Sequence, residues 1–214
     1  MEVLSSNDRA AIERAVEALR RGEVIAIPTE TVYGVAALPL PDSVERLINV
    51  KQRSPDKGIQ LLIDSIDQAS QICVLPPTAE QLARAFWPGG LTLVLDRRPD
   101  NDLPLLLGGG RATLGLRLPD HPVPREIARL LGPLAASSAN VTGLPPATTA
   151  QMVTDSLSDV LSLVIDDGPV RGGVSSSVVD CSGSAALSPA VLREGAIASS
   201  AIFAALARDY TWAP

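Results

Sequence analysis

The sequence predicts an α/β protein with a twisted sheet of mixed parallel and antiparallel strands, flanked by helices and enclosing a concave ligand site. Two observations favour this class: short apolar segments typical of strands alternate with amphipathic segments at helical spacing. Several neighbouring strands have hairpin-like connections, so the sheet is not expected to be wholly parallel. Because no linker-like run divides the 214 residues, we expect one domain over residues 1–214.

The first third of the chain is expected to hold two helices and three strands. The helix over Ser5 to Arg21 has apolar residues at helical spacing, a Ser or Asn cap and a stop at Gly22. The strands are expected at Glu23–Ile27, Thr31–Ala37 and Ile59–Ile63, with the second helix at Pro41–Gln52.

Further elements follow from capping signals, alternation and Pro or Gly breaks. We expect strands at Leu91–Leu95, Thr113–Arg117, Leu134–Ala136, Leu161–Ile165, Val178–Cys181 and Ala190–Arg193. We expect helices over Thr78–Phe86 and Val123–Leu131, another with a capping box at Thr148 to Gln151, and a last one over Ile197–Arg208. Trp87 is interpreted as a packing plug, and Arg97–Arg111 as a surface loop whose glycines at 108–110 can move.

Charge, hydropathy and the Cys and His content exclude several classes of function. The net charge of −6 argues against unselective nucleic-acid binding, so an anionic ligand needs local cations, backbone N–H groups or a metal ion. No run of eighteen apolar residues and no basic-then-apolar leader is found, which indicates no membrane segment and a cytoplasmic location. Cys73 and Cys181 lack metal-ligand spacing and are expected to be buried thiols, and the single His121 is expected to be structural.

Polar residues gather where strands are expected to end or to expose one face. Strict alternation at residues 113–117 places Thr113, Gly115 and Arg117 on one face, over a floor without a side chain at Gly115. Small polar groups at 137–140 follow a strand, where α/β proteins tend to bind ligands. Lys51 and Arg53 suit either a helix end or a phosphate site, and the Gly- and Ser-rich residues 171–177 suit either an ordinary loop or an anion-binding nest.

Four motifs in order resemble the YrdC-type threonylcarbamoyl-AMP synthases: Pro28-Thr29-Glu30-Thr31-Val32-Tyr33-Gly34, Lys51-Gln52-Arg53, Ser138-Ala139-Asn140 and Leu192-Arg193-Glu194-Gly195. The resemblance extends over nearly the whole chain. It implies a YrdC-like fold and a nucleotidyltransferase that forms threonylcarbamoyl-AMP and pyrophosphate from L-threonine, bicarbonate and ATP. The product would serve N6-threonylcarbamoyladenosine modification of tRNA through a transfer complex, and a weak direct contact with tRNA is compatible with this role.

The resemblance also implies site residues. Threonine would be held by Thr31, Arg117, Ala136 and Ser176, with Arg117 on its carboxylate as a bidentate pair. ATP would be held by Lys51, Arg53, Lys57, Thr113, Ser138, Asn140 and Arg193. Lys51 and Arg53 would contact the phosphates as the catalytic pair, and we expect their replacement to leave the fold intact. Mg²⁺ is expected to accompany ATP, without a metal site built from protein ligands.

The chain departs from the family pattern at four positions. Ala36 replaces the second Gly of a Tyr-Gly-Leu-Gly pattern, and Pro146 replaces a Ser that can contact ATP. Lys57 and Leu62 stand where longer members carry Asn and His, and we interpret both as traits of the short subtype.

Two other functions remain open. An RNA-binding module would use Lys51, Arg53, Arg111 and Arg117 on a concave surface, but the acidic charge and the scarcity of aromatic residues argue against it. The carbamoyl-adenylate-forming domain of a hydrogenase-maturation protein has a similar fold, but the zinc-finger cysteines of such a protein are not found here.

Overall fold

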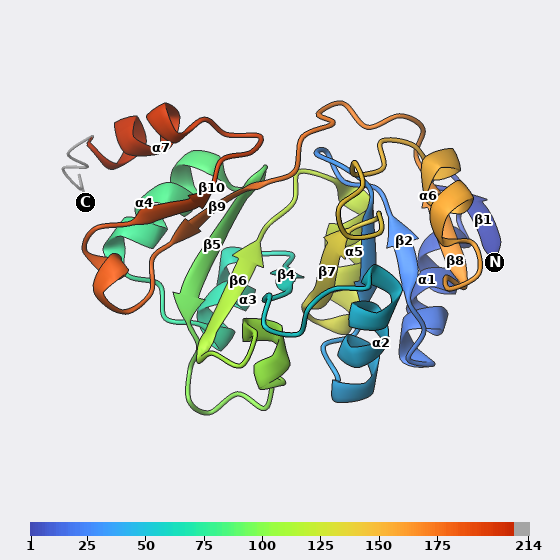
Figure 1. Ribbon diagram of the computed structural model, residues 1–214, viewed down its shortest axis with the longest axis horizontal. Coiled ribbons are helices and arrows are strands. Elements are labelled where there is room, and N and C mark those ends of the chain that lie inside the picture. Colours follow the sequence, from blue (N-terminus) through green and yellow to red (C-terminus); the bar gives the residue numbers. More distant parts are fainter. Residues whose placement is uncertain (208–214) are drawn as a thin grey trace.

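The computed structural model describes residues 1–207, and the strands within this range form one ten-stranded sheet. The strands are β1 (Glu2–Ser5), β2 (Ile25–Ile27), β3 (Gly34–Ala37), β4 (Gln60–Leu62), β5 (Leu91–Asp96), β6 (Thr113–Arg117), β7 (Leu134–Ser138), β8 (Leu163–Asp166), β9 (Ser177–Asp180) and β10 (Ala190–Arg193). Their order across the sheet is β1-β8-β2-β3-β7-β4-β6-β5-β9-β10 (Figure 1). Parallel pairs such as β4–β6 stand beside antiparallel pairs such as β5–β6, which confirms the predicted mixed sheet.

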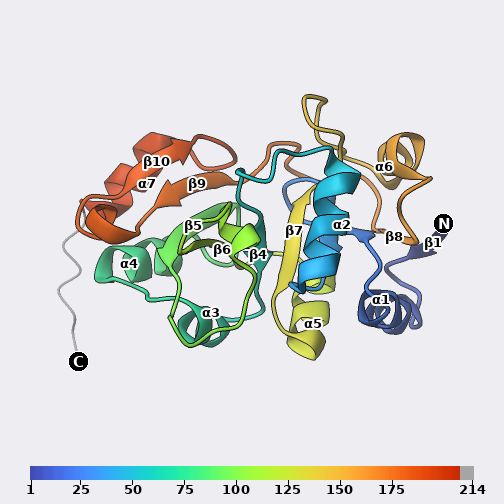
Figure 2. The ribbon, with the colours of Figure 1, turned by 60° about the horizontal axis from the view of Figure 1, so that its bottom comes forward.

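Helices cover both faces of the sheet (Figure 2). They are α1 (Ala11–Arg20), α2 (Pro41–Lys51), α3 (Ile66–Ile72), α4 (Pro77–Phe86), α5 (Pro122–Leu131), α6 (Ala150–Leu157) and α7 (Ser199–Leu206). Short 3-10 turns lie at Leu105–Gly108 and Gly183–Ala186. Between residues 1 and 207, none of the helices is long and apolar enough to cross a bilayer.

Strand alternation divides the buried side chains into two cores. Ile25 and Ile27 pack with α1 and α5 on one face, whereas Ala26 between them belongs to the larger core on the other face. Figure 2 shows α1 and α5 below the strands, whereas Val44 and Leu47 of α2 pack in the larger core with Ala26. Because side chains of a strand point alternately to opposite faces, a strand that is apolar throughout must be covered on both sides.

The predicted first helix is too long at its N-terminal end. Residues before Ala11 form β1, which pairs in parallel with β8, followed by a turn in which the Asp8 carboxylate accepts the N–H of Ala10 at 2.9 Å. The expected Ser or Asn cap is also wrong, because Ala10 is the cap and its side chain makes no capping bond. The stop at Gly22 is confirmed by its φ of +76°.

Both predicted capping boxes are wrong in detail. The Thr78 hydroxyl donates to the carbonyl of Ala186 at 2.6 Å, and the helix begins at Pro77 without a side-chain cap. The next box is shifted by one residue, since Thr149 is the cap and accepts the N–H of Met152. In addition, α3 was not expected, although Ser65 caps it with an ordinary side-chain bond.

Several other predictions are confirmed. β9 and β10 pair antiparallel, and Cys73 and Cys181 are free and buried, which raises the pKa of each thiol to about 12. Trp87 is buried and its indole N–H donates to the carbonyl of Leu91 at 2.7 Å. His121 is structural: Nδ1 accepts the N–H of Val123 and so caps α5.

Two further predictions concern the last helix and Ala36 in β3. The last helix spans Ser199–Leu206 within the predicted range, whose final residue, Arg208, lies outside the described residues. Ala36 lies in β3 opposite Ile25 and is not among the residues with positive φ, so an Ala is accommodated there without strain.

Candidate active site

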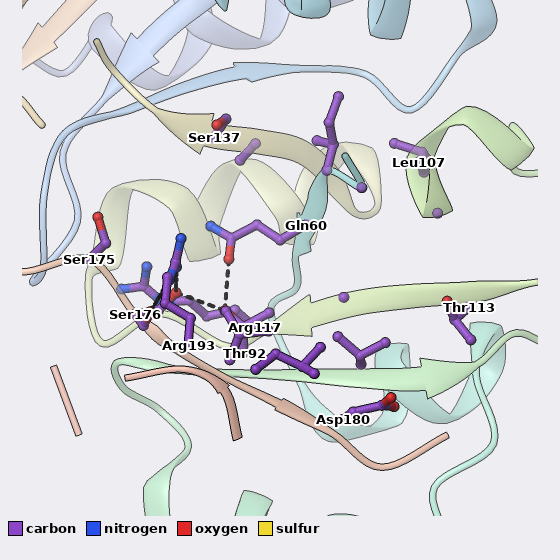
Figure 3. Close-up of a pocket in the computed structure, with 18 of the residues that line it drawn as sticks. Gln60, Thr92, Leu107, Thr113, Arg117, Ser137, Ser175, Ser176, Asp180 and Arg193 are labelled. Carbon is purple, nitrogen blue, oxygen red and sulfur yellow. Dashed lines mark hydrogen bonds between the residues drawn. The ribbon is translucent and has the colours of Figure 1, made fainter. Parts of the chain in front are cut away.

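A cavity of about 480 Å³ opens where the central and C-terminal strands meet (Figure 3). Its walls come from β4, β5, β6, β9 and β10, from the end of β7, and from the loops beside them. Seven residues predicted to bind ligand line it: Arg53, Thr113, Arg117, Ala136, Ser138, Ser176 and Arg193. Four others do not belong to its lining: Thr31, Lys51, Lys57 and Asn140.

The alternation of β6 is as predicted. Leu114 and Leu116 are buried in the core, and Thr113, Gly115 and Arg117 line the cavity. Gly115 forms a floor without a side chain, between the neighbouring strands β4 and β5. Period-two side-chain geometry therefore places a hydroxyl and a guanidinium on the same wall.

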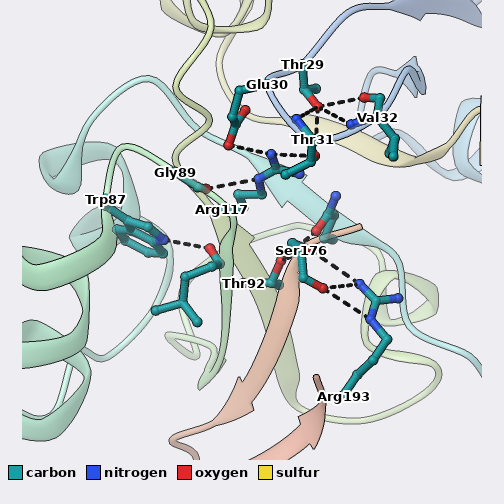
Figure 4. A network of polar contacts seen from close by, with 12 residues as sticks. Thr29, Glu30, Thr31, Val32, Trp87, Gly89, Thr92, Arg117, Ser176 and Arg193 are labelled. Atoms are coloured by element: carbon teal, nitrogen blue, oxygen red, sulfur yellow. Dashed lines mark hydrogen bonds and ion pairs between the residues drawn. The ribbon is translucent and has the colours of Figure 1, made fainter. Parts of the chain in front are cut away.

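Arg117 is held firmly beneath the cavity (Figure 4). Its side chain is 2% exposed; Nη2 donates to Glu30 Oε1 at 2.7 Å and to Thr31 Oγ1 at 2.8 Å, and Nε donates to the carbonyl of Gly89. Only Nη1 has no recorded partner among the described residues. A bidentate clamp on a ligand carboxylate through Nη1 and Nη2 therefore requires Glu30 or Thr31 to release an N–H of Nη2, which differs from the simple pair expected from the sequence.

The loop before β3 is stabilised by its own polar groups. Thr29 Oγ1 accepts the N–H groups of Thr31 and Val32, both at 3.2 Å. The Tyr33 hydroxyl donates to the carbonyl of Gly168 at 2.8 Å and accepts the N–H of Asp167 at 3.1 Å. Thr29 and Tyr33 therefore shape the loop without lining the cavity. Within residues 28–34, Val32 lines the cavity and Thr31 contacts Arg117.

Lys51 ends α2, as the helix-end interpretation expects, but its side chain is buried. It is 2% exposed, and its ammonium donates to the carbonyls of Ser138 and Asn140 and to Asn140 Oδ1. Burial, with a smaller contribution from the charge of Arg53, lowers the pKa of Lys51 to about 8. In this geometry Lys51 fixes the polar end of β7, and its predicted phosphate contact requires the ammonium to leave these acceptors.

Arg53 follows the left-handed Gln52 that ends α2. Its Nη2 donates to the carbonyl of Gly58 at 2.8 Å, and burial lowers the pKa of its guanidinium. Lys57 is exposed and contributes its backbone carbonyl to Arg53. Arg53 therefore lies at the cavity wall, whereas the side chain of Lys57 does not.

Arginines give the cavity a local positive charge. Arg53, Arg111, Arg117 and Arg193 line it, against the single carboxylate of Asp180. Burial lowers the pKa of Arg193, and the charges of Arg53 and Arg117 lower it further. The site therefore attracts anions although the whole chain has a net charge of −6.

Sequence reasoning missed several lining residues, among them Gln60, Thr92 and Asp180. A signal for the first two existed: each is a polar residue within a short apolar strand segment, Ile59–Ile63 and Leu91–Leu95. A polar residue buried in such a strand needs a hydrogen-bond partner, which points to a polar site.

A cavity lined by four arginines on a mixed α/β sheet is suited to binding small anionic ligands. The Sua5/YciO/YrdC family model, described as telomere recombination, matches residues 17–195. The chain belongs to this family.

Three relatives show the extent of the similarity. The threonylcarbamoyl-AMP synthase of Bacillus subtilis is 37% identical over 206 residues, which cover 95% of this chain and 58% of that protein. A Mycobacterium tuberculosis relative is 36% identical over 200 residues, 92% of this chain and 90% of its own length. The crystal structure of Pyrococcus abyssi Sua5 complexed with L-threonine has a TM-score of 0.88 and 32% identity, and the match covers 96% of this chain and 60% of that one.

Proposed function

We propose that this protein is a threonylcarbamoyl-AMP synthase that joins L-threonine, bicarbonate and ATP. The name of the Bacillus subtilis relative and the threonine complex of the archaeal Sua5 support this function. This chain spans 58% and 60% of those two longer proteins, so transfer of their whole activity is part of the proposal.

The observation that carries the proposal is one cavity lined by candidates for both substrates. Arg117 and Ser176 are the candidates for threonine, and Arg53, Thr113, Ser138 and Arg193 are the candidates for ATP. Two substrates held in one cavity react as if at high effective concentration.

The reaction needs charge neutralisation and positioning. The neutral amine of threonine attacks the carbon derived from bicarbonate, water leaves, and a carbamate forms. A carbamate oxygen then bonds to the α-phosphorus of ATP while the bond from that phosphorus to the pyrophosphate oxygen breaks. Arg53 and Arg193 would offset the charge of the phosphates, and Arg117 that of the threonine carboxylate.

Magnesium is proposed to enter with the nucleotide. Among residues 1–207 no cluster of three or more His, Cys, Asp or Glu side chains could hold a metal ion, and Asp180 is the only carboxylate in the cavity lining. The described residues thus offer no cage for a cation, so the phosphate oxygens of ATP would supply most ligands.

We further propose that the adenylate passes to a tRNA threonylcarbamoyl-transfer complex in the cytoplasm. The direct test of the function is to incubate the protein with ATP, threonine, Mg²⁺ and carbon-13 bicarbonate and to examine products by mass spectrometry. Threonylcarbamoyl-AMP carrying one added mass unit is expected. Its absence, together with salt-sensitive binding of tRNA, would favour the RNA-binding alternative.

A further inference from the structure

A chain of hydrogen bonds crosses the floor of the cavity, from Arg193 to Gln60 (Figure 3). Arg193 Nη2 donates to Ser176 Oγ at 3.3 Å, Ser176 Oγ and Thr92 Oγ1 lie 2.9 Å apart, and Thr92 Oγ1 donates to Gln60 Oε1 at 2.8 Å. Ser176 and Thr92 are each 2% exposed. We call these four residues the floor relay.

Gly115 allows the floor relay to form. Gln60 lies on β4 and Thr92 on β5, and β6 runs between these strands, so their backbones are about 10 Å apart. A Cβ on Gly115 of β6 would lie 3.3 Å from Thr92 Cγ2 and 3.7 Å from Gln60 Cβ. Without that atom, the two side chains meet over the middle strand.

The relay has a direction. A hydroxyl donates one hydrogen, and Thr92 uses its own on Gln60 Oε1, so at the contact with Ser176 it must accept. The Ser176 hydroxyl therefore donates to Thr92, and its remaining acceptor capacity faces Arg193 and the cavity. The carbonyl oxygen of the Gln60 amide is therefore fixed by its hydrogen bond from Thr92 at the floor of the cavity.

The opposite end of that amide is free to bind a ligand. Gln60 Nε2 has no recorded partner among the described residues, and Gln60 lines the cavity, where Figure 3 shows its nitrogen turned away from Thr92. Arg117 and Arg193 line the same cavity and supply positive charge to it.

We propose that Gln60 is a substrate-binding residue whose amide N–H₂ donates to a carboxylate or carbamate oxygen of the amino-acid substrate, and that Thr92 is the residue that orients it. This inference rests on the proposed function, because it concerns the threonine side of that site. The threonine side is preferred over the nucleotide side because Ser176, a candidate threonine contact, is one step beyond Thr92 in the relay, whereas Arg193, a candidate ATP contact, lies at its far end.

The test compares binding of L-threonine and of ATP, each by calorimetry, in variants of the full chain. Gln60→Met removes both ends of the amide at similar length, and we expect threonine to bind about tenfold more weakly while ATP binding stays within about twofold. Gln60→Glu keeps the acceptor for Thr92 but turns an anionic oxygen to the ligand, so threonine should bind more weakly than in Gln60→Met. Gln71→Met, on the exposed surface of α3, is the matched control.

Thr92 is tested through coupling. Thr92→Val should weaken threonine binding about as much as Gln60→Met, and Thr92→Ser should restore it to within about twofold of the unmodified protein. The double variant Gln60→Met with Thr92→Val should lose less affinity than the two single losses combined, because part of the effect of Thr92 passes through Gln60 and the rest through Ser176. Melting temperatures would identify any variant that loses binding by unfolding.

If the unmodified protein releases pyrophosphate, three results would overturn the inference about Gln60 and Thr92 while leaving the proposed function standing. The first is threonine binding by Gln60→Met within twofold of the unmodified protein. The second is an additive double variant, and the third is tighter threonine binding by Gln60→Glu than by Gln60→Met, which would reverse the direction of the amide. An unmodified protein that neither binds threonine nor releases pyrophosphate would remove the proposed function and this inference together.

Discussion

At the scale of single residues, Lys51 shows how burial changes the meaning of a motif. The sequence placed it at a helix end, where a cation contributes only about 0.3 to 1 kcal/mol, and replacement was expected to leave the fold intact. In the structure its ammonium satisfies three acceptors at the end of β7. Removing it takes a donor from the part-buried carbonyl of Asn140, whereas the carbonyl of Ser138 still accepts the N–H of Asn140 at 3.0 Å. A loss of stability is therefore expected, and the intact fold stays a prediction.

Lys51→Met is therefore expected to lower the free energy of unfolding at pH 7 by about 1 to 3 kcal/mol and to weaken ATP binding. Chemical denaturation and calorimetry measure the two effects. Lys57→Met, an exposed lysine in the following loop, is the control. Unchanged stability in Lys51→Met would contradict the buried contacts described above.

The pKa of Lys51 also predicts a pH dependence of stability. The folded value of about 8 lies below the ordinary 10.5, so between these pH values the unfolded chain holds more protons than the folded chain. The free energy of unfolding of the unmodified protein, relative to Lys51→Met, should rise from pH 8 to pH 10.5 by about 3 kcal/mol at most. Below pH 8 the difference should be constant, and a difference that is flat throughout would show an ordinary lysine.

Glu30 is expected to compete with the carboxylate of threonine for Arg117. Its Oε1 occupies Nη2 of Arg117, and its Oε2 is buried without a hydrogen-bond partner among the described residues. Glu30→Gln keeps an acceptor for Arg117 but removes the charge, so threonine should bind more tightly, by up to about tenfold. Calorimetry with L-threonine measures this, and weaker binding would show that Glu30 assists the substrate instead.

At the scale of elements, the loop over residues 97–111 is packed more tightly than its glycines suggested. Cβ atoms added at Gly108 and Gly109 would lie 2.3 Å from the carbonyl oxygen of Thr113 and 2.2 Å from that of Asp56. Gly110 has open space around the same atom. The motion expected at Gly108 to Gly110 stays a prediction, and the first two glycines are needed for close backbone contact.

Gly108→Ala should displace Thr113 at the cavity wall and so weaken ATP binding, by about tenfold or more. Gly110→Ala, which meets no neighbour, is the matched variant and should cost only the strain of its φ of +80°. ATP titrations of both variants measure the difference. Equal effects would mean that the close contact at Gly108 does not position the site.

Strands were easier to predict than helix ends, and physical reasons explain why. The alternation of residues 113–117 depends only on the geometry of one strand, so Thr113 and Arg117 were placed on the cavity face correctly. The cap at Thr78 failed because a tertiary contact with the carbonyl of Ala186 takes its hydroxyl. The cap at Thr148 was off by one residue, since Thr149 caps the helix and the Thr148 hydroxyl donates to Met152 Sδ in the first turn. The floor relay needs β6 between β4 and β5, and this order of strands is not contained in any local pattern.

At the scale of the whole molecule, the cavity carries a charge opposite in sign to the net charge of the chain. The chain has a net charge of −6, yet the cavity lining holds four arginines and one carboxylate. Such an arrangement concentrates anionic substrates at the site while disfavouring long polyanions elsewhere on the surface. It supports a small-molecule enzyme more than an RNA-binding module.

Because the described residues offer no metal cage, activity is expected to depend on the magnesium that ATP carries. Chelation by EDTA should abolish product formation, and Mg²⁺ in excess over ATP should restore it fully. The folded state should not change, since no ligand cluster between residues 1 and 207 would be emptied. A melting temperature lowered by EDTA alone would reveal a structural metal that this account does not contain.

The central claim is that one cavity joins threonine, bicarbonate and ATP, and pyrophosphate release tests it most directly. The protein is assayed with all three substrates and with threonine and bicarbonate omitted in turn, after removal of dissolved carbon dioxide. The account predicts release only when both are present, and strong loss of release in Arg193→Met, because Arg193 lies in the cavity and binds the Ser176 carbonyl. Release that is independent of threonine or bicarbonate, or no release by the folded protein with magnesium present, would contradict it.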